Sequence, residues 1–313
     1  CAMFMLNDTQ TKPTVFLLTG IPGQEAINLW ISMLFFSMYA ISIMGNSVIL
    51  FIIKTNLSLH EPMYIFLSML ALTDLCLSVS TMPTILGIFW FNSREISIDA
   101  CLVQLFFIHS LSFIESSVLL SMAFDRYVAI CNPLRYASVL TTPRIVRMGL
   151  VFTIRGMGLI FPLPFLLKRF QYCGDNVLSH SFCLHQEVMK LACSDITVNS
   201  IYGLFVIITT VGLDSLLILL SYAMILRTVL RIASREERFK ALNTCVSHVC
   251  AVLLFYTPMI GLSVVHRFGG NSAPLVQILM GYVYMLVPPL MNPIVYSVKT
   301  KQIRVRIARV LSR

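Results

Sequence analysis

The sequence predicts an all-α membrane protein, a seven-transmembrane helix bundle with a short amphipathic helix after the seventh span. Of the 313 residues, 57% are hydrophobic and only 12% are charged, whereas soluble domains carry about 25% charged residues. Seven apolar stretches each approach or exceed the roughly 20 residues that cross a hydrocarbon core as a helix. These stretches are residues 29–53, 62–89, 101–124, 145–167, 198–226, 242–264 and 275–298.

The segments between these stretches are short. The longest lies between Leu167 and Val198, which is too little chain for a soluble domain. We therefore expect one seven-transmembrane domain over residues 1–313. Its parts are an N-terminal tail (1–27), the bundle with its loops (28–298) and a basic amphipathic helix (299–313) with Ile303, Ile307 and Val310 on its apolar side.

Lysine and arginine predict the orientation of the bundle. Most of the 23 lie on the side of the C-terminus when the N-terminus is outside, and basic residues favour the cytoplasmic side. We therefore expect an extracellular N-terminus, where the sequon Asn7-Asp8-Thr9 predicts glycosylation at Asn7. The net charge of +9 then faces anionic lipid and a cytoplasmic partner, and it does not indicate nucleic acid binding.

Four of the nine cysteines are expected on the outer side. Cys101 begins the third span, and Cys173, Cys183 and Cys193 lie in the second outer loop. An oxidising compartment favours disulfides between them, and four cysteines allow three pairings. A loop that is tied in this way is expected to cover a pocket.

The third span carries polar groups at both of its ends. His109, Glu115, Asp125 and Arg126 occur in an otherwise apolar run, and ionisable groups at membrane depth usually mark a functional interior. A helix rises about 1.5 Å per residue, so about 24 Å separate His109 from Asp125. The span therefore predicts a binding site near one membrane face that is linked to a switch near the other.

Two acids are expected at a similar depth. Asp74 lies midway along the second span and Glu115 midway along the third. Two ionised carboxylates at this depth would repel each other, so either a shared proton or a cation such as sodium is required. Arg155 lies within the fourth span, and the sequence alone identifies no partner for it.

Five motifs carry a resemblance to a known family. MAFDRYVAIC at 122–131 resembles the signature of odorant receptors, within the rhodopsin-like receptor superfamily. LHEPMY at 59–64 resembles a family motif that precedes it, and Ser221-Tyr222, KALNTCVSH (240–248) and PLMNPIVY (289–296) match further family motifs that follow it in order. The long second outer loop and GIPG at 20–23 favour the class I, fish-like branch.

The resemblance implies a multi-pass receptor of the plasma membrane. It would bind a small odorant and activate a heterotrimeric G protein of the olfactory/stimulatory class, which raises cAMP. Receptors of this superfamily often hold sodium beside the residue that matches Asp74, and no other cofactor is implied. The implied disulfides are Cys101–Cys183 and Cys173–Cys193. The implied activation switch consists of Asp125, Arg126, Tyr127, Tyr222, His248, Asn292, Pro293 and Tyr296.

Eight residues are predicted to bind the ligand in the outer half of the bundle. They are His109, Ser112, Phe113 and Ser116 on one face of the third span, His185 and Gln186 in the loop, and Ser263 and Arg267 in the sixth span. We find many donors and no facing acid on these three segments, which favours an anion, and Arg binds carboxylate through two parallel hydrogen bonds. Class I odorant receptors are associated with carboxylic acids, so a small fatty acid is expected.

The sequence also bears on three other classes of protein. Asp74, Glu115 and Arg155 also suit a membrane transporter that uses intramembrane acids for ion coupling, although no internal repeat is evident. An adhesion or scaffold protein would not need an ionisable interior. An enzyme is not expected, because no Ser/His/Asp arrangement, zinc-ligand spacing or phosphate-binding glycine loop is visible.

Overall fold

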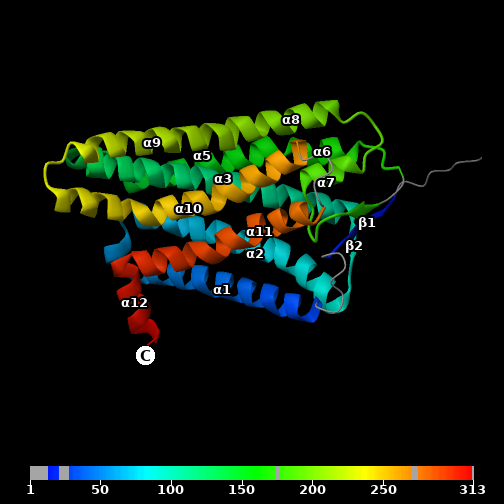
Figure 1. Cartoon of the computed structure of the whole chain (residues 1–313), viewed down its shortest axis with the longest axis horizontal. Coiled ribbons are helices and arrows are strands. Elements are labelled where there is room, and N and C mark those ends of the chain that lie inside the picture. The colour runs from blue at the N-terminus through cyan, green and yellow to red at the C-terminus, as the bar shows by residue number, and fades with distance from the viewer. Residues whose placement is uncertain (1–12, 21–27, 174–175, 269–273, 312–313) are drawn as a thin grey trace, which may run out of the picture.

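The computed structural model describes residues 13–20, 28–173, 176–268 and 274–311. Within them, seven helical spans are long and apolar enough to cross a membrane, and they run side by side in one elongated bundle (Figure 1). The spans are α1 (Asn28–Thr55), α2 (Pro62–Phe91), α3 (Ile98–Cys131), α5 (Thr142–Ile160) with α6 (Pro162–Lys168), α8 (Thr197–Ile207) with α9 (Leu213–Leu230), α10 (Arg235–Phe268) and α11 (Pro274–Lys299).

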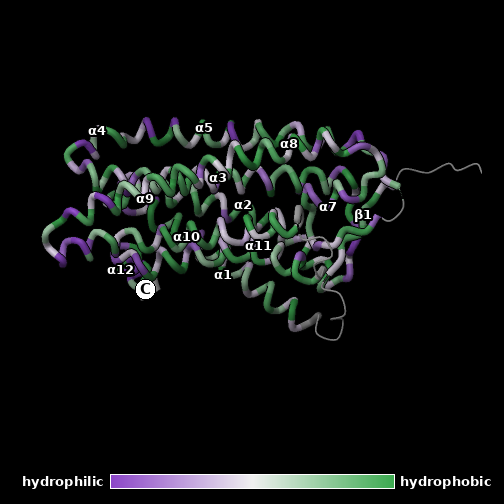
Figure 2. The backbone as a smooth tube through the Cα atoms, turned by 45° about the horizontal axis from the view of Figure 1, so that its top comes forward, coloured by the Kyte–Doolittle hydropathy of each residue, from purple (hydrophilic) through white to green (hydrophobic). Residues whose placement is uncertain are grey.

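All seven predicted stretches are confirmed as helices. Each helical span contains its predicted stretch and extends beyond it, most of all at Cys131 of α3 and Arg235 of α10. The extensions contain charged residues, which a count of apolar residues leaves out. Apolar colour accordingly dominates the middle of each span, and hydrophilic colour gathers towards the ends and α12 (Figure 2).

The third span is the central element of the bundle. In α3, 72% of the most apolar window is buried, against 22% for the window in α5 and α6. It packs against α2, α5 and α9. Large apolar side chains on the outer helices point away from the bundle instead, for example Ile154 and Leu219, as is expected of a surface that faces lipid.

Two spans are interrupted. α5 ends before Pro162, which has no backbone N–H to continue the helix, and α6 begins there. Between α8 and α9 lies a π-helical segment, η4 (Ile208–Gly212). Such wider turns are rare and frequently occur at functional sites.

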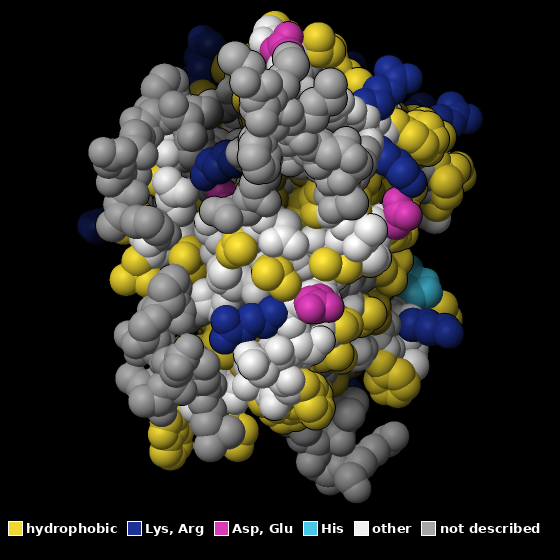
Figure 3. All heavy atoms as spheres, turned by 90° about the vertical axis from the view of Figure 1, so that its right-hand side faces the viewer, with side chains coloured by type: hydrophobic (Ala, Val, Ile, Leu, Met, Phe, Trp, Pro, Cys, Tyr) yellow, Lys and Arg dark blue, Asp and Glu magenta, His cyan; other side chains and the backbone are white. Residues whose placement is uncertain are grey.

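One end of the bundle carries a small sheet and a folded loop. The sheet has the order β2-β1-β3 and joins β1 (Val15–Leu18), β2 (Glu95–Ser97) and β3 (Val177–Leu178). We call residues 169–196, between α6 and α8, the lid; it contains β3 and α7 (His185–Lys190). Viewed onto this lid end, charged side chains lie among hydrophobic ones (Figure 3).

The lid is tied to α3 and to itself. The structure contains both disulfides that the resemblance implies, with Cα atoms 5.5 Å apart in Cys101–Cys183 and 5.6 Å apart in Cys173–Cys193. In the lid, the Tyr172 hydroxyl donates to the Leu167 carbonyl at 2.8 Å, and burial raises the pKa of Tyr172 to about 12.

The opposite end carries the short helices η2 (Leu57–Leu59), η3 (Pro133–Arg135), α4 (Tyr136–Val139) and α12 (Lys301–Leu311). The predicted C-terminal amphipathic helix is confirmed as α12, which turns away from the direction of the spans after the end of α11 (Figure 1). Ile303 is fully buried, and Arg306, three residues further along α12, donates to Asn56 and Ser58.

Candidate functional site

A cavity lies below the lid, between α3, α5, α6, α8, α10 and α11. Five of the eight predicted ligand residues line it, namely His109, Phe113, His185, Gln186 and Ser263. The space open to the centre of a water molecule is about 60 Å³, where a single water needs on the order of 10–15 Å³. Most of the remaining wall is apolar, and among the described residues no charged side chain lines it. The cavity thus suits a small, largely apolar molecule.

The polar groups below the lid bond to one another. The His185 backbone N–H donates to His109 Nε2 at 3.3 Å, so this nitrogen carries no proton. The His185 ring bonds Asn199 Oδ1 through Nε2 at 2.8 Å. This ring fits because α8 has a glycine beside it: a Cβ on Gly203 would come within 3.0 Å of His185 Cε1.

Two other predicted ligand residues, Ser112 and Ser116, are described by the structure and do not line this cavity. Ser112 lies behind the wall and accepts a hydrogen bond from Tyr284 at 2.7 Å, and Tyr284 itself is a wall residue. Ser116 lies deeper, bonded to Asp214 and Tyr256. The side chain of Arg267 lies outside the described residues, as does Asn7, and both remain predictions.

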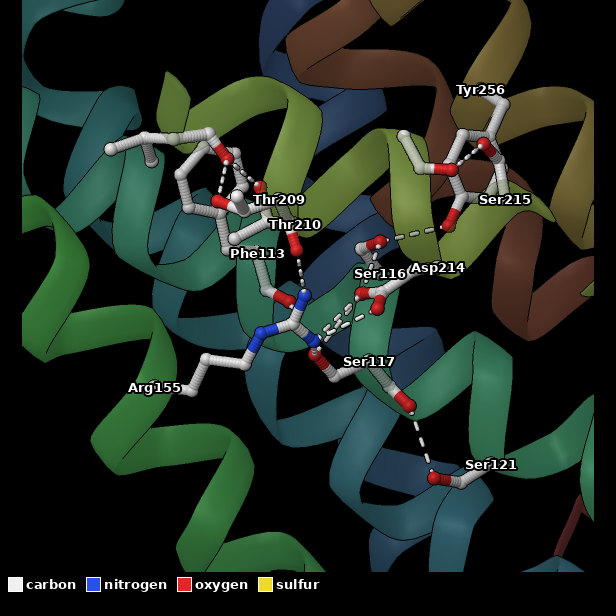
Figure 4. A network of polar contacts seen from close by, with 12 residues as sticks. Phe113, Ser116, Ser117, Ser121, Arg155, Thr209, Thr210, Asp214, Ser215 and Tyr256 are labelled. Atoms are coloured by element: carbon white, nitrogen blue, oxygen red, sulfur yellow. Dashed lines mark hydrogen bonds and ion pairs between the residues drawn. The ribbon is translucent and has the colours of Figure 1, made fainter. Parts of the chain in front are cut away.

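Arg155 has a partner that the sequence analysis did not identify. Its Nη1 donates to Asp214 Oδ1 at 2.8 Å and to Ser117 Oγ at 3.1 Å, and its Nη2 donates to the carbonyl of Thr209 in η4 at 2.7 Å. Figure 4 shows Arg155 reaching from α5 towards Asp214 on α9 and the serines of α3. The buried Asp214 side chain also accepts from Ser116 at 3.0 Å.

A signal for this pair exists in the sequence. Asp214 is the only charged residue in the predicted stretch 198–226. An unpaired charge in a span is costly. Asp214 in the fifth span and Arg155 in the fourth could therefore have been predicted to form an ion pair. The two hydrogen bonds of Ser116, to Asp214 and Tyr256, depend on helix packing. No pattern in the sequence predicts them.

The structure brings the predicted acid pair together through an amide. Asn292 Nδ2 donates to Asp74 Oδ2 at 3.0 Å and to Glu115 Oε1 at 3.4 Å. All three side chains are buried. Among the described residues, Asp74 Oδ1 and Asn292 Oδ1 have no hydrogen-bond partner, so both oxygens can accept a further hydrogen bond.

The predicted switch residues form separate pairs at the α12 end. Asp125 holds the Arg126 guanidinium at 2.6 Å and accepts from the Tyr136 hydroxyl at 2.7 Å. Burial and the Asp125 charge raise the pKa of Tyr136, which keeps this donor protonated. Tyr222 bonds His248 at 2.6 Å, rather than Arg126.

Of the other switch residues, Asn292 bonds the acid pair, and Tyr296, Tyr127 and Pro293 each make a separate contact. The buried Tyr296 hydroxyl points to Met122 Sδ at 3.9 Å. Tyr127 packs beside the apolar cluster of Ile225, Val229 and Cys245. Pro293 lies against Gly45 of α1, where an added Cβ would come within 2.9 Å of the proline ring.

A lidded cavity at one end of a central helix, and an Asp-Arg-Tyr cluster at its other end, define the chain as a rhodopsin-like seven-helix receptor. The fold comparison agrees, because the crystal structure of squid rhodopsin matches 95% of this chain and 90% of its own with a TM-score of 0.75, at 17% identity. The profile of the olfactory receptor family matches residues 35–313.

Curated relatives make the assignment more specific. Human olfactory receptor 51G2 is 70% identical over 301 residues, which cover 96% of each chain, and mouse olfactory receptor 51E2 is 58% identical over 93% of this chain and 91% of its own. The chain belongs to the olfactory receptor family, in family 51 of class I. It is a multi-pass olfactory G-protein-coupled receptor and not an enzyme, which decides against the transporter and scaffold alternatives.

Proposed function

We propose that this receptor binds a small carboxylic acid in the cavity below the lid and thereby activates an olfactory/stimulatory G protein that raises cAMP. The observation that carries the proposal is the position of Ser263 on the cavity wall, with Arg267 four residues further along α10. Residues at this spacing share one helix face. The arginine would hold the carboxylate through two parallel hydrogen bonds.

The rest of the cavity supports a short apolar tail on that acid. Phe113, Leu184 and Met259 offer apolar surface, while Gln186 and Ser263 offer neutral donors. His109 Nε2 is already an acceptor for the lid backbone, so His109 is a positioning group for the lid in this proposal.

The ligand proposal is tested by comparing an acid with its methyl ester and its alcohol in a cAMP assay. Arg267→Ala should weaken the response to the acid at least about tenfold, because charge-assisted hydrogen bonds contribute about 1.5–3 kcal/mol. Arg267→Lys should restore only part, since an ammonium lacks the planar fork. An ester as active as the acid, or full potency of the acid on the Arg267→Ala receptor, would overturn the proposal that the ligand is a carboxylic acid.

We further propose that the lid end faces outwards at the plasma membrane. The support is the concentration of basic residues near the α12 end, such as Arg135, Arg306 and Arg309. An epitope tag at the N-terminus should be accessible on intact cells, and a tag at the C-terminus only after permeabilisation. Glycosidase treatment should increase gel mobility in the wild type and not in Asn7→Gln.

Arg126 is proposed as the centre of the switch. A ligand shifts the receptor only if it binds one helix arrangement better than the other, and the active arrangement would release Arg126 from Asp125 towards Tyr222. Arg126→Ala should abolish cAMP signalling while surface expression survives. Normal signalling by that variant at equal expression would remove Arg126 from the switch.

A further inference from the structure

The lid is bonded to the helices beneath it. The Cys183 backbone N–H donates to Gln104 of α3 at 2.9 Å, and His185 bonds both His109 of α3 and Asn199 of α8. The Cys101–Cys183 disulfide holds the same segment to α3. A ligand that arrived from the lid side would have to displace these contacts.

A second hollow lies on the other side of the cavity wall. It is a groove of about 250 Å³ between α8, η4 and α9 on one side and α10 on the other. Ile207, Met259 and Ser263 line both the groove and the cavity. The groove and the cavity are therefore separated by the thickness of single side chains.

The groove faces the lipid side of the bundle. Ile208 and Ile260, one from each wall, are 57% and 50% exposed, and both belong to helices that cross the membrane. Apart from two serines, its wall is apolar, and among the described residues it has no charged side chain. One of the serines, Ser215, donates its proton to the Gly212 carbonyl at 2.9 Å, so the surface offered to lipid is almost wholly apolar.

We propose that this groove admits odorants that are dissolved in the bilayer, and that they reach the cavity by passing between Ile207 and Met259. The proposal rests on the cavity being the odorant site. Met259 is unbranched and has three rotatable bonds, so it changes shape readily. Ile207 is the last residue of α8 before the π-helical turn, and α10 packs more closely against α11 than against α9.

The chemistry of the route selects an uncharged molecule with one polar group. An acid would travel in its protonated form, and Ser263, which lines both spaces, would bond the polar group with its hydroxyl during passage. Each added methylene enriches a molecule in the bilayer about fourfold. The rate of binding at a fixed aqueous concentration should therefore rise about fourfold per methylene until the cavity is full.

Two glycines allow a matched test. Gly212 lies in the groove wall and does not line the cavity, and a Cβ there meets nothing closer than 3.9 Å. Gly158 on α5 is likewise exposed, and a Cβ there meets nothing within 4 Å. Gly212→Phe fills the groove from the lipid side, while Gly158→Phe adds the same bulk elsewhere on the lipid face.

The experiment measures the rates of association and dissociation for the full-length receptor in lipid nanodiscs. The probes are butanoic, pentanoic and hexanoic acid and the corresponding alcohols. Gly212→Phe should slow both rates at least tenfold and leave the equilibrium response almost unchanged, and Gly158→Phe should match the wild type. If Gly212→Phe does not reach the nanodisc stage, Ser215→Phe fills the same groove.

The outcomes separate this proposal from the ligand proposal. Unchanged rates in the groove variants, or wild-type rates that do not rise with chain length, would overturn the membrane route. If the groove variants slow the rates for the alcohols and the acids do not activate the receptor, the membrane route is supported and the carboxylic acid proposal is overturned. Equal slowing by both phenylalanine variants would also overturn it, because the effect would then belong to added bulk and not to the groove.

Discussion

Two buried acid sites lie on opposite sides of α3, and they are balanced very differently. Asp214 meets an arginine at 2.8 Å and accepts from two serine hydroxyls. Asp74 and Glu115 share the amide of Asn292, with no cationic partner among the described residues. The residues that α3 contributes to the two sites, Glu115 and then Ser116 and Ser117, are consecutive in the chain.

The difference assigns the two sites different tasks. The Arg155–Asp214 site is neutral as it stands, so it needs no further ion and can hold α3, α5 and α9 together in one arrangement. The Asp74–Glu115 site carries excess negative charge until a proton or a cation joins it. The charge of the Asp74–Glu115 site therefore depends on what it binds, whereas the charge of the Arg155–Asp214 site does not.

The largest expected effect comes from breaking the balanced site. Asp214→Asn leaves the Arg155 charge without a counter-charge, and breaking a buried pair in this way costs about 3–5 kcal/mol. The thermal stability of the solubilised receptor should fall sharply, with loss of surface expression. Replacing both partners, as Arg155→Met with Asp214→Asn, should recover most of it.

Asp99 provides the matched control for that loss. It forms a pair of similar length with Lys168, 2.7 Å, but its side chain is 75% exposed. Exposed pairs contribute about 0–1 kcal/mol, so Asp99→Asn should leave stability nearly unchanged. Equal losses at the two aspartates would show that burial does not distinguish them.

A smaller effect is expected at the unbalanced site. If sodium joins Asp74 and Glu115, raising sodium should favour the inactive arrangement and shift agonist curves to higher concentration, on the order of tenfold. Glu115→Gln should blunt that shift while the receptor remains folded, because glutamine keeps the shape and one acceptor oxygen. A sodium response that survives the substitution would favour a shared proton here.

The smallest effect sharpens the comparison within α3. Ser117→Ala removes one hydroxyl from the Arg155–Asp214 site and should cost about 1 kcal/mol of stability. Ser121→Ala is the control, because both serines are buried and both donate to the carbonyl four residues earlier. If Ser121→Ala lowers the melting temperature as much as Ser117→Ala does, or more, the stabilising role assigned to Ser117 in the Arg155–Asp214 site is contradicted.

The sequence predicts how deep a residue lies in the membrane better than it predicts which neighbouring helix its side chain faces. Counting along each span placed Asp74 level with Glu115, and Asn292 joins them in the structure. The charges of Arg155 and Asp214 could be matched from the sequence across 59 residues, but their bonds to Ser117 and Thr209 depend on how α5 and α9 are rotated against α3. The π-helical turn η4 and the four-residue strand β1 also depend on tertiary contacts rather than on their own composition.

The contact between Gly45 and Pro293 leaves no room for a side chain on α1 at this point. Substituting alanine for Gly45 adds one methyl group, a change usually regarded as mild, yet that carbon would lie 2.9 Å from a proline ring that cannot bend away. The neighbour of that proline is Asn292, which bonds both acids. Gly45→Ala would therefore be expected to disturb the Asp74–Glu115 site from the neighbouring helix α1, through a contact that contains no polar side chain.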